Sequence, residues 1–218
     1  MKLSLPRLAA VAGLTIGALA FPIAASASGA VDPSIYRSSG QMAQLSFDIP
    51  DPVNPCLDTS GFLFAGNFTN ATPGSPATSE MFGGVFVVRT DNCAGTFLSG
   101  VFYKGLLPAG AFQIDKNLTS ASLVTTVTAR DEGGNPVPVT LNVAWNGTGA
   151  LTSGTWSSHY QRPGVNIVTH SSGDSRDAGA TGTLAVGSNS LAIATTGSLQ
   201  SNRSFDLFLC HSPLTGCK

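Results

Sequence analysis

The sequence predicts an all-β protein: a single antiparallel β-sandwich domain of roughly ten to twelve strands, with a closed antiparallel β-barrel as the alternative. Three observations predict this class. Apolar and polar residues alternate with a period of two along most of the chain, turn signals rich in Gly, Pro and Asn separate the alternating runs, and a 3.6-residue helical period is missing. The one helix we expect is short, at residues 33–41.

The N-terminal 27 residues are expected to be a cleaved secretory signal peptide. Lys2 and Arg7 precede an uncharged run at residues 8–21, and Ala25-Ser26-Ala27 supplies the small residues that a signal peptidase requires. The run is shorter than the about 20 residues of a membrane-spanning helix. We therefore expect residues 28–218 to form one domain that is secreted or periplasmic, without membrane insertion of the mature chain.

The composition excludes one class of partner. Charged residues make up 11% of the chain and the net charge is -1, whereas an average protein has about 25% charged residues. Strong electrostatic binding to nucleic acid needs a basic surface that this chain does not have. The abundance of Gly, Ser, Thr and Asn fits strands and tight turns better than helices.

The four cysteines are expected to form two disulfides in an oxidising compartment. Cys210 and Cys217 enclose six residues that include a Pro and a Gly, which favour a chain reversal. Cys56 and Cys93 then pair by elimination. Scattered cysteines of this kind do not have the spacing of a metal site.

The alternating runs define the expected strands. We expect them at residues 44–49, 62–68, 84–89, 97–104, 111–114, 118–130, 137–145, 153–160, 165–170, 180–186, 190–195 and 203–209. The connections between them are short, and short connections join antiparallel neighbours because a parallel pair needs a crossover of a dozen or more residues.

The aromatic residues are expected mainly in the core. Trp145 shares a face with Val139, Leu141 and Val143. The same interpretation applies to the phenylalanines, with residues 62, 64 and 68 in one register and residues 82 and 86 in another. Trp156 and Tyr160 share a face of one strand, where an aromatic stripe is also able to stack against a carbohydrate.

The polar stretch THSSGDSRDAGA, residues 169–180, contains the residue types of a hydrolase active site (His, Ser and Asp), but we expect it to be a surface connection between strands. Clustered Ser and Asp side chains mostly bond to nearby backbone, and no G-x-S-x-G pentapeptide occurs. The site candidates that remain are His159, His170, Asp174 and Asp177. A hairpin turn at residues 161–164 places the two histidines four residues apart, and a turn at residues 163–164 halves this offset, so we assign no metal site.

These observations predict a secreted, non-catalytic β-sandwich protein that is envelope-associated or binds a protein or carbohydrate partner. We assign no catalytic residue and no cofactor. A barrel that binds a small ligand and a secreted hydrolase that uses the His170 region are the alternatives.

Overall fold

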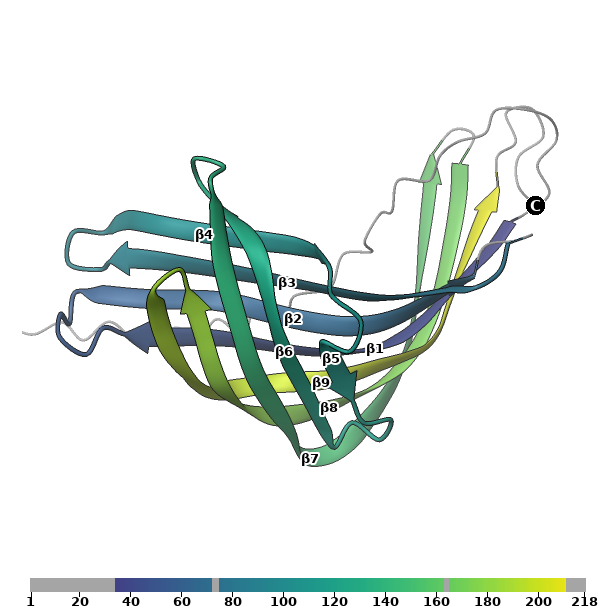
Figure 1. Cartoon of the computed structure of the whole chain (residues 1–218). Coiled ribbons are helices and arrows are strands. Elements are labelled where there is room, and N and C mark those ends of the chain that lie inside the picture. The colour runs from purple at the N-terminus through teal and green to yellow at the C-terminus, as the bar shows by residue number, and fades with distance from the viewer. Residues whose placement is uncertain (1–33, 72–74, 163–164, 211–218) are drawn as a thin grey trace, which may run out of the picture. The chain divides into compact units, whose positions relative to one another are not determined.

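The computed structural model describes residues 34–71, 75–162 and 165–210, and in this part of the chain every regular element is a strand. The strands are β1 (Ser34–Pro50), β2 (Leu57–Ala71), β3 (Thr78–Asp91), β4 (Thr96–Leu106), β5 (Phe112–Ile114), β6 (Ser120–Asp131), β7 (Pro136–Arg162), β8 (Val165–Val186) and β9 (Asn189–Cys210). All pairings are antiparallel (Figure 1). The predicted all-β, antiparallel class is therefore confirmed.

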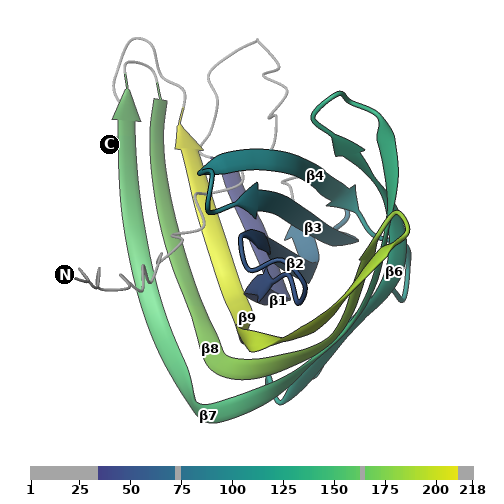
Figure 2. The same ribbon diagram turned by 90° about the vertical axis from the view of Figure 1, so that its left-hand side faces the viewer.

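The nine strands belong to one sheet that wraps into a ring. Their order is β4-β3-β2-β1-β9-β8-β7-β6-β5. The ring is closed by an additional pairing of β4 with β6, in which Val101 lies opposite Asp131 and Phe102 lies opposite Arg130 (Figure 2). The strands that a sandwich divides between two stacked sheets thus form a single curved sheet here.

The turn between β6 and β7 lies directly beside this closure. The Asp131 carboxylate accepts hydrogen bonds from the side chain of Asn135, at 3.0 Å and 3.2 Å, and from its backbone N–H at 2.8 Å. These bonds hold the pKa of the Asp131 carboxyl below its usual value, since they favour the charged form. The turn therefore keeps its shape while the carboxyl is ionised.

The described residues form nine strands instead of the expected ten to twelve, because predicted strands merge in pairs. The runs at residues 137–145 and 153–160 are both part of β7, those at 165–170 and 180–186 are part of β8, and those at 190–195 and 203–209 are part of β9. The short helix expected at residues 33–41 is also wrong, since β1 begins at Ser34.

The expectation of a surface connection at residues 169–180 is wrong as well. This stretch is the middle of β8, with β7 on one side and β9 on the other: His170, for example, lies opposite Ser157 and Asp206. Because two neighbouring strands take up the backbone donors and acceptors, the local turn preference of Ser, Asp and Gly is overridden.

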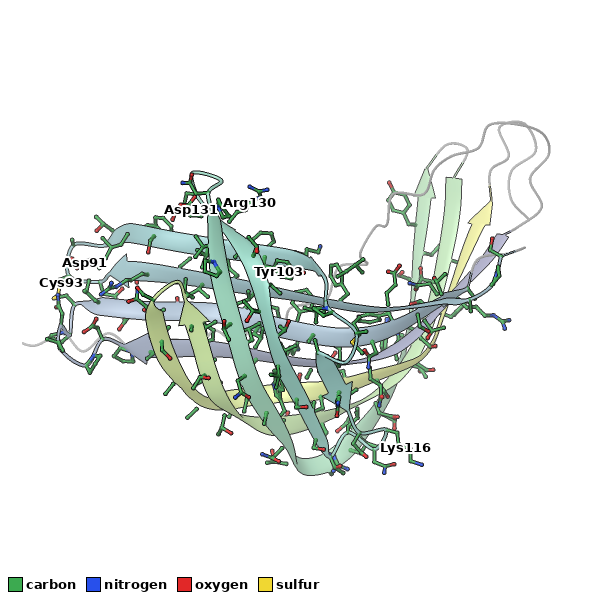
Figure 3. All side chains as sticks on the ribbon, in the orientation of Figure 1. Asp91, Cys93, Tyr103, Lys116, Arg130 and Asp131 are labelled. Atoms are coloured by element: carbon green, nitrogen blue, oxygen red, sulfur yellow. A yellow bond between two sulfur atoms is a disulfide. The ribbon has the colours of Figure 1, made fainter. Side chains whose placement is uncertain are left out.

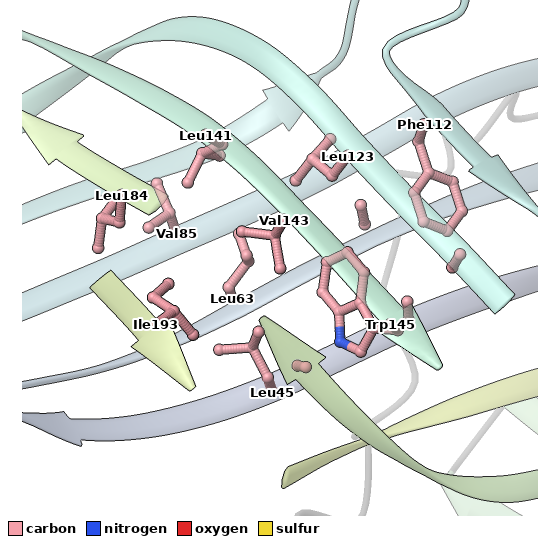
Figure 4. Packing of buried hydrophobic residues seen from close by; sticks show 14 of the residues in the cluster. Leu45, Leu63, Val85, Phe112, Leu123, Leu141, Val143, Trp145, Leu184 and Ile193 are labelled. Carbon is pink, nitrogen blue, oxygen red and sulfur yellow. The ribbon is translucent and has the colours of Figure 1, made fainter. Parts of the chain in front are cut away.

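The inner face of the ring carries the hydrophobic core. Trp145 and Phe112 are its largest fully buried side chains, and leucines and valines from most of the strands surround them (Figure 4). On β7, Trp145 lies opposite Ala121 of β6 and Ala180 of β8. Two small side chains beside one large one leave room for the indole ring, as close packing requires.

The disulfide between Cys56 and Cys93 is confirmed, with a Cα–Cα distance of 5.1 Å. It joins the residue before β2 to the turn after β3, at the end of the β2–β3 pair where Asp91 and Cys93 are labelled in Figure 3. A disulfide is compatible with an extracellular or periplasmic location. Cys217 of the predicted Cys210–Cys217 disulfide and the predicted signal peptide, residues 1–27, lie outside the described residues, so neither prediction is tested.

Among the described residues, no helix is long and apolar enough to cross a membrane.

Candidate functional site

A row of polar side chains crosses the inner face of five neighbouring strands beyond the core. The strand register places these residues directly opposite one another, from β2 through β1, β9 and β8 to β7: Asn67, Gln41, Ser201, Asp174 and Ser153. We call these five residues the polar row. Its one charged member is a sequence-predicted candidate, Asp174.

Asp174 is buried, with 9% of its surface exposed. The Ser153 hydroxyl donates a hydrogen bond to Oδ1 of Asp174 at 2.6 Å, and the Ser201 hydroxyl donates one to Oδ2 at 3.3 Å. A buried carboxylate is costly unless it is hydrogen-bonded, so the two hydroxyls stabilise it. A hollow of about 230 Å³ lies beside it, lined by Ser153, Gly154, Thr155, Ser172, Gly173 and Asp174.

The two predicted histidines lie further along the same hairpin. His170 is opposite Ser157, and His159 is opposite Val168, so the offset between them is two residues, as the turn at residues 163–164 implied. Both side chains are exposed. His170 and Asp174 are four residues apart on one strand, about 13 Å at 3.3 Å per residue. The register therefore does not bring this histidine and this carboxylate together as a Ser-His-Asp triad requires.

Asp177, the fourth candidate, lies on the other face of the sheet. It is three residues from Asp174, and successive side chains of a strand point to opposite faces. It is exposed, opposite Thr148 and Ser198. Asp174 and Asp177 therefore cannot hold one metal ion between them.

Cys56, Asp91 and Cys93 form a group of side chains within 4.8 Å among the described residues, a spacing that suits a metal ion. Both cysteines are joined in the disulfide, so their sulfur atoms are not available as thiolate ligands.

The hydrogen bond from Ser153 to Asp174 can be tested by mutation. Removing the hydroxyl in Ser153→Ala should lower the free energy of unfolding by about 1 to 2 kcal/mol, because a hydrogen bond to a buried charged group is lost. Thr155→Ala is the control, since Thr155 lines the same hollow two residues along β7; it should change stability by less than about 0.5 kcal/mol. Urea unfolding of the two variants measures this. Equal losses would contradict the assigned role of Ser153.

A second candidate site is an apolar surface on the outer face of β2, β3 and β4. It consists of Phe62, Phe64, Phe82, Phe86, Phe102 and Leu106, which we call the phenylalanine surface. Their neighbours in sequence, such as Leu63 and Val85, point into the core and are 1% and 2% exposed. The phenylalanine surface therefore points away from the core, and Phe86, Phe102 and Leu106 are 45%, 54% and 62% exposed.

The strand register makes the phenylalanine surface continuous. Phe62 lies opposite Phe86, which lies opposite Phe102, and four residues along β3, Phe82 lies opposite Leu106. The Phe64 ring links the two rows, with its centroid 5.8 Å from that of Phe62 and 6.0 Å from that of Phe82. These spacings are within the range of favourable aromatic pairs.

Glycine on the neighbouring strand makes room for one of these rings. A Cβ atom at Gly84 would collide with the edge of the Phe64 ring, so the ring lies across Gly84. Positive charge lies on the β4 side of the surface. Lys104 is opposite Gly84, between Phe102 and Leu106 on β4, with its Nζ 5.9 Å from the centroid of the Phe82 ring, and Arg130 of β6 lies opposite Phe102. The result is an apolar surface on β2 and β3 with a basic side along β4 and β6.

The prediction that these phenylalanines fill the core is wrong for the phenylalanine surface. Residues 83–88 are apolar at almost every position, so both faces of β3 are apolar. Alternation alone does not say which of two apolar faces is the inner one. The excess of apolar residues in this strand was the available sequence signal, because a strand of a sheet with a single core needs only one apolar face.

Comparison with known proteins does not identify the chain. No protein-family model matches it, and no curated protein matches it. Among solved structures, it is similar to a crystal structure from Nitrosomonas europaea whose assignment as AttH is provisional, at 12% identity and a TM-score of 0.25. The likeness covers 84% of this chain and 52% of that chain, so this chain spans about half the length of the protein it matches. A TM-score of this size carries no argument about function.

Proposed function

We propose that the protein is exported, is not an enzyme, and binds an apolar partner through the phenylalanine surface. The observation that carries this proposal is the exposure of Phe86 and Phe102, directly opposite each other on β3 and β4, together with exposed Leu106 four residues along β4 on the same face. Single exposed apolar residues are common, but a contiguous exposed apolar patch on a soluble protein marks an interaction site. Export is supported by the charge, apolar run and small residues at the N-terminus, and the disulfide agrees with it.

The chemistry of the surface favours a protein partner over a carbohydrate. A sugar site needs several hydrogen-bonding groups beside its aromatic rings, whereas the three rows that β2, β3 and β4 form here consist of five phenylalanines, two glycines, Leu106 and Lys104. Protein interfaces have apolar, aromatic-rich centres with a polar rim. Because Lys104 and Arg130 lie on the β4 and β6 side of the surface, the best fit is a partner with an apolar centre and acidic residues along one side.

The two alternative functions have less support. A carrier of small ligands needs space inside the ring, which is occupied by Trp145, Phe112 and the rest of the core. A hydrolase that uses the His170 region needs a base near a nucleophile, and the about 13 Å between His170 and Asp174 argues against that site.

The test is a binding experiment with the exported protein and the envelope fraction of its own source. The double variant Phe86→Ser/Phe102→Ser should bind at least about tenfold more weakly, because central aromatic residues of an interface contribute 2 kcal/mol or more each. Val124→Ser is the matched control: Val124 is 61% exposed on β6 and lies outside the phenylalanine surface.

Circular dichroism should show the same folded spectrum for both variants and the wild type. The proposal fails if the wild type does not sediment with the envelope fraction, or if the double variant and Val124→Ser bind equally well.

A further inference from the structure

The second half of β7 is an edge of the sheet. Pairing of β7 with β6 ends at Asn146 opposite Ser120, and the last backbone bond between these segments runs from the N–H of Gly147 to the carbonyl of Thr119, at 2.8 Å. β7 nevertheless continues to Arg162, paired on its other side with β8 (Figure 1). Within the described chain, no strand pairs with the outer side of residues 148–158.

This edge lacks the features that keep sheet edges apart. Residues 148–160 are exposed, and they include no Asp, Glu, Lys, Arg or Pro. Natural edge strands are usually short, carry charges or Pro, or are covered. A bulge at residues 149–151, with Gly149 at φ 71°, interrupts the edge, but from Thr152 onward the pairing with β8 is regular.

The sequence of this edge also allows it to pair with the same edge of a second copy of the chain. When two copies of a strand pair antiparallel about a twofold axis, one residue lies opposite its own copy. A charged residue near that axis would face a like charge, which is unfavourable. The edge has none, and its regular part, residues 152–160, is centred on Trp156, which is 55% exposed.

We propose that β7 pairs with β7 of a second copy of this chain, antiparallel and centred on Trp156, so that the two sheets join. In this register Trp156 faces Trp156 of the other copy, Gly154 faces Ser158, and Thr155 faces Ser157. An aromatic pair lies on the axis, with small residues on both sides of it. This interface does not involve the phenylalanine surface and does not depend on the proposed function.

The experiment uses charge at the axis. Trp156→Glu and Trp156→Lys should each dimerise at least about tenfold more weakly than the wild type, since each places like charges opposite one another. An equimolar mixture of the two should recover a dimer, because Glu then faces Lys. Sedimentation velocity at several concentrations measures all three samples, and Val124→Glu, on the outer face of β6, should dimerise like the wild type.

A second variant tests the register. Directly opposite residues of an antiparallel pair have Cα atoms about 4.5 to 5.5 Å apart, within disulfide range. Oxidised Trp156→Cys should therefore form a covalent dimer, whereas Val124→Cys should not. A wild type that stays monomeric, a Trp156→Glu variant that still dimerises, or a mixture of charge variants that does not associate would each overturn the proposal. A heterologous strand as the true occupant would appear as the first of these outcomes.

Discussion

Replacing Trp145 with alanine is expected to lower the free energy of unfolding by about 3 to 5 kcal/mol, the usual effect of truncating a fully buried large aromatic side chain. Trp145 is 0% exposed and packs beside Ala121 and Ala180, which are too small to fill the space that the indole leaves. Its Nε1–H also donates a hydrogen bond to the carbonyl of Gln44 at 3.2 Å, so the change removes a link between β7 and β1. Because typical domains are stable by about 5 to 15 kcal/mol, this variant should be near the limit of folding.

The measurement is urea unfolding followed by far-ultraviolet circular dichroism. Trp145→Phe keeps a ring but loses the N–H donor, so it should have an intermediate stability. Val124→Ala, at an exposed position of β6, should change the stability by less than about 0.5 kcal/mol. If Trp145→Ala were as stable as Val124→Ala, the assigned core would be incorrect.

Removal of the Cys56–Cys93 disulfide should have the next largest effect. In the chain-entropy description, opening a loop of 37 residues lowers the free energy of unfolding by about 3 to 4 kcal/mol, since the unfolded chain gains freedom. The bridge closes the end of the β2–β3 pair, where the backbone N–H of Asn92 also donates to the carbonyl of Cys56 at 2.7 Å. The double variant Cys56→Ser/Cys93→Ser tests this without leaving a free thiol.

Urea midpoints of the wild type and the double variant, both without reductant, give the difference. Adding reductant to the wild type should move its midpoint towards that of the double variant, while the double variant itself should not respond. Equal midpoints in all samples would show that this bridge does not stabilise the fold.

Local alternation in the sequence was sufficient to predict the class of the fold and much of its inner face. The pattern at residues 137–145 is an example: Val139, Leu141, Val143 and Trp145 share a face and are all buried. The Cys56–Cys93 pair also followed from counting, because one short C-terminal loop left only two other cysteines. These features depend on residues that are close in sequence or on simple elimination.

Two other features depend on contacts between distant strands, which no local pattern reports. Residues 169–180 have the composition of a turn, yet β7 and β9 hold them in an extended strand. That placement brought Asp174 between Ser153 and Ser201, 21 and 27 residues away in the chain. The phenylalanine surface was missed for a related reason, because the inner face of β3 is decided only when the sheet closes.

Radical footprinting measures whether the phenylalanine surface is exposed in the free protein and covered by the partner, as we propose. Oxidation is mapped by mass spectrometry with and without the envelope fraction. Phe86, Phe102 and Leu106 should be oxidised in the free protein and protected in the mixture. Phe112, which is 1% exposed, should be protected in both samples, and Val124, which is 61% exposed, should react equally in both. If oxidation of Phe86 and Phe102 is unchanged on binding, or if both are already protected in the free protein, the proposed interface is wrong.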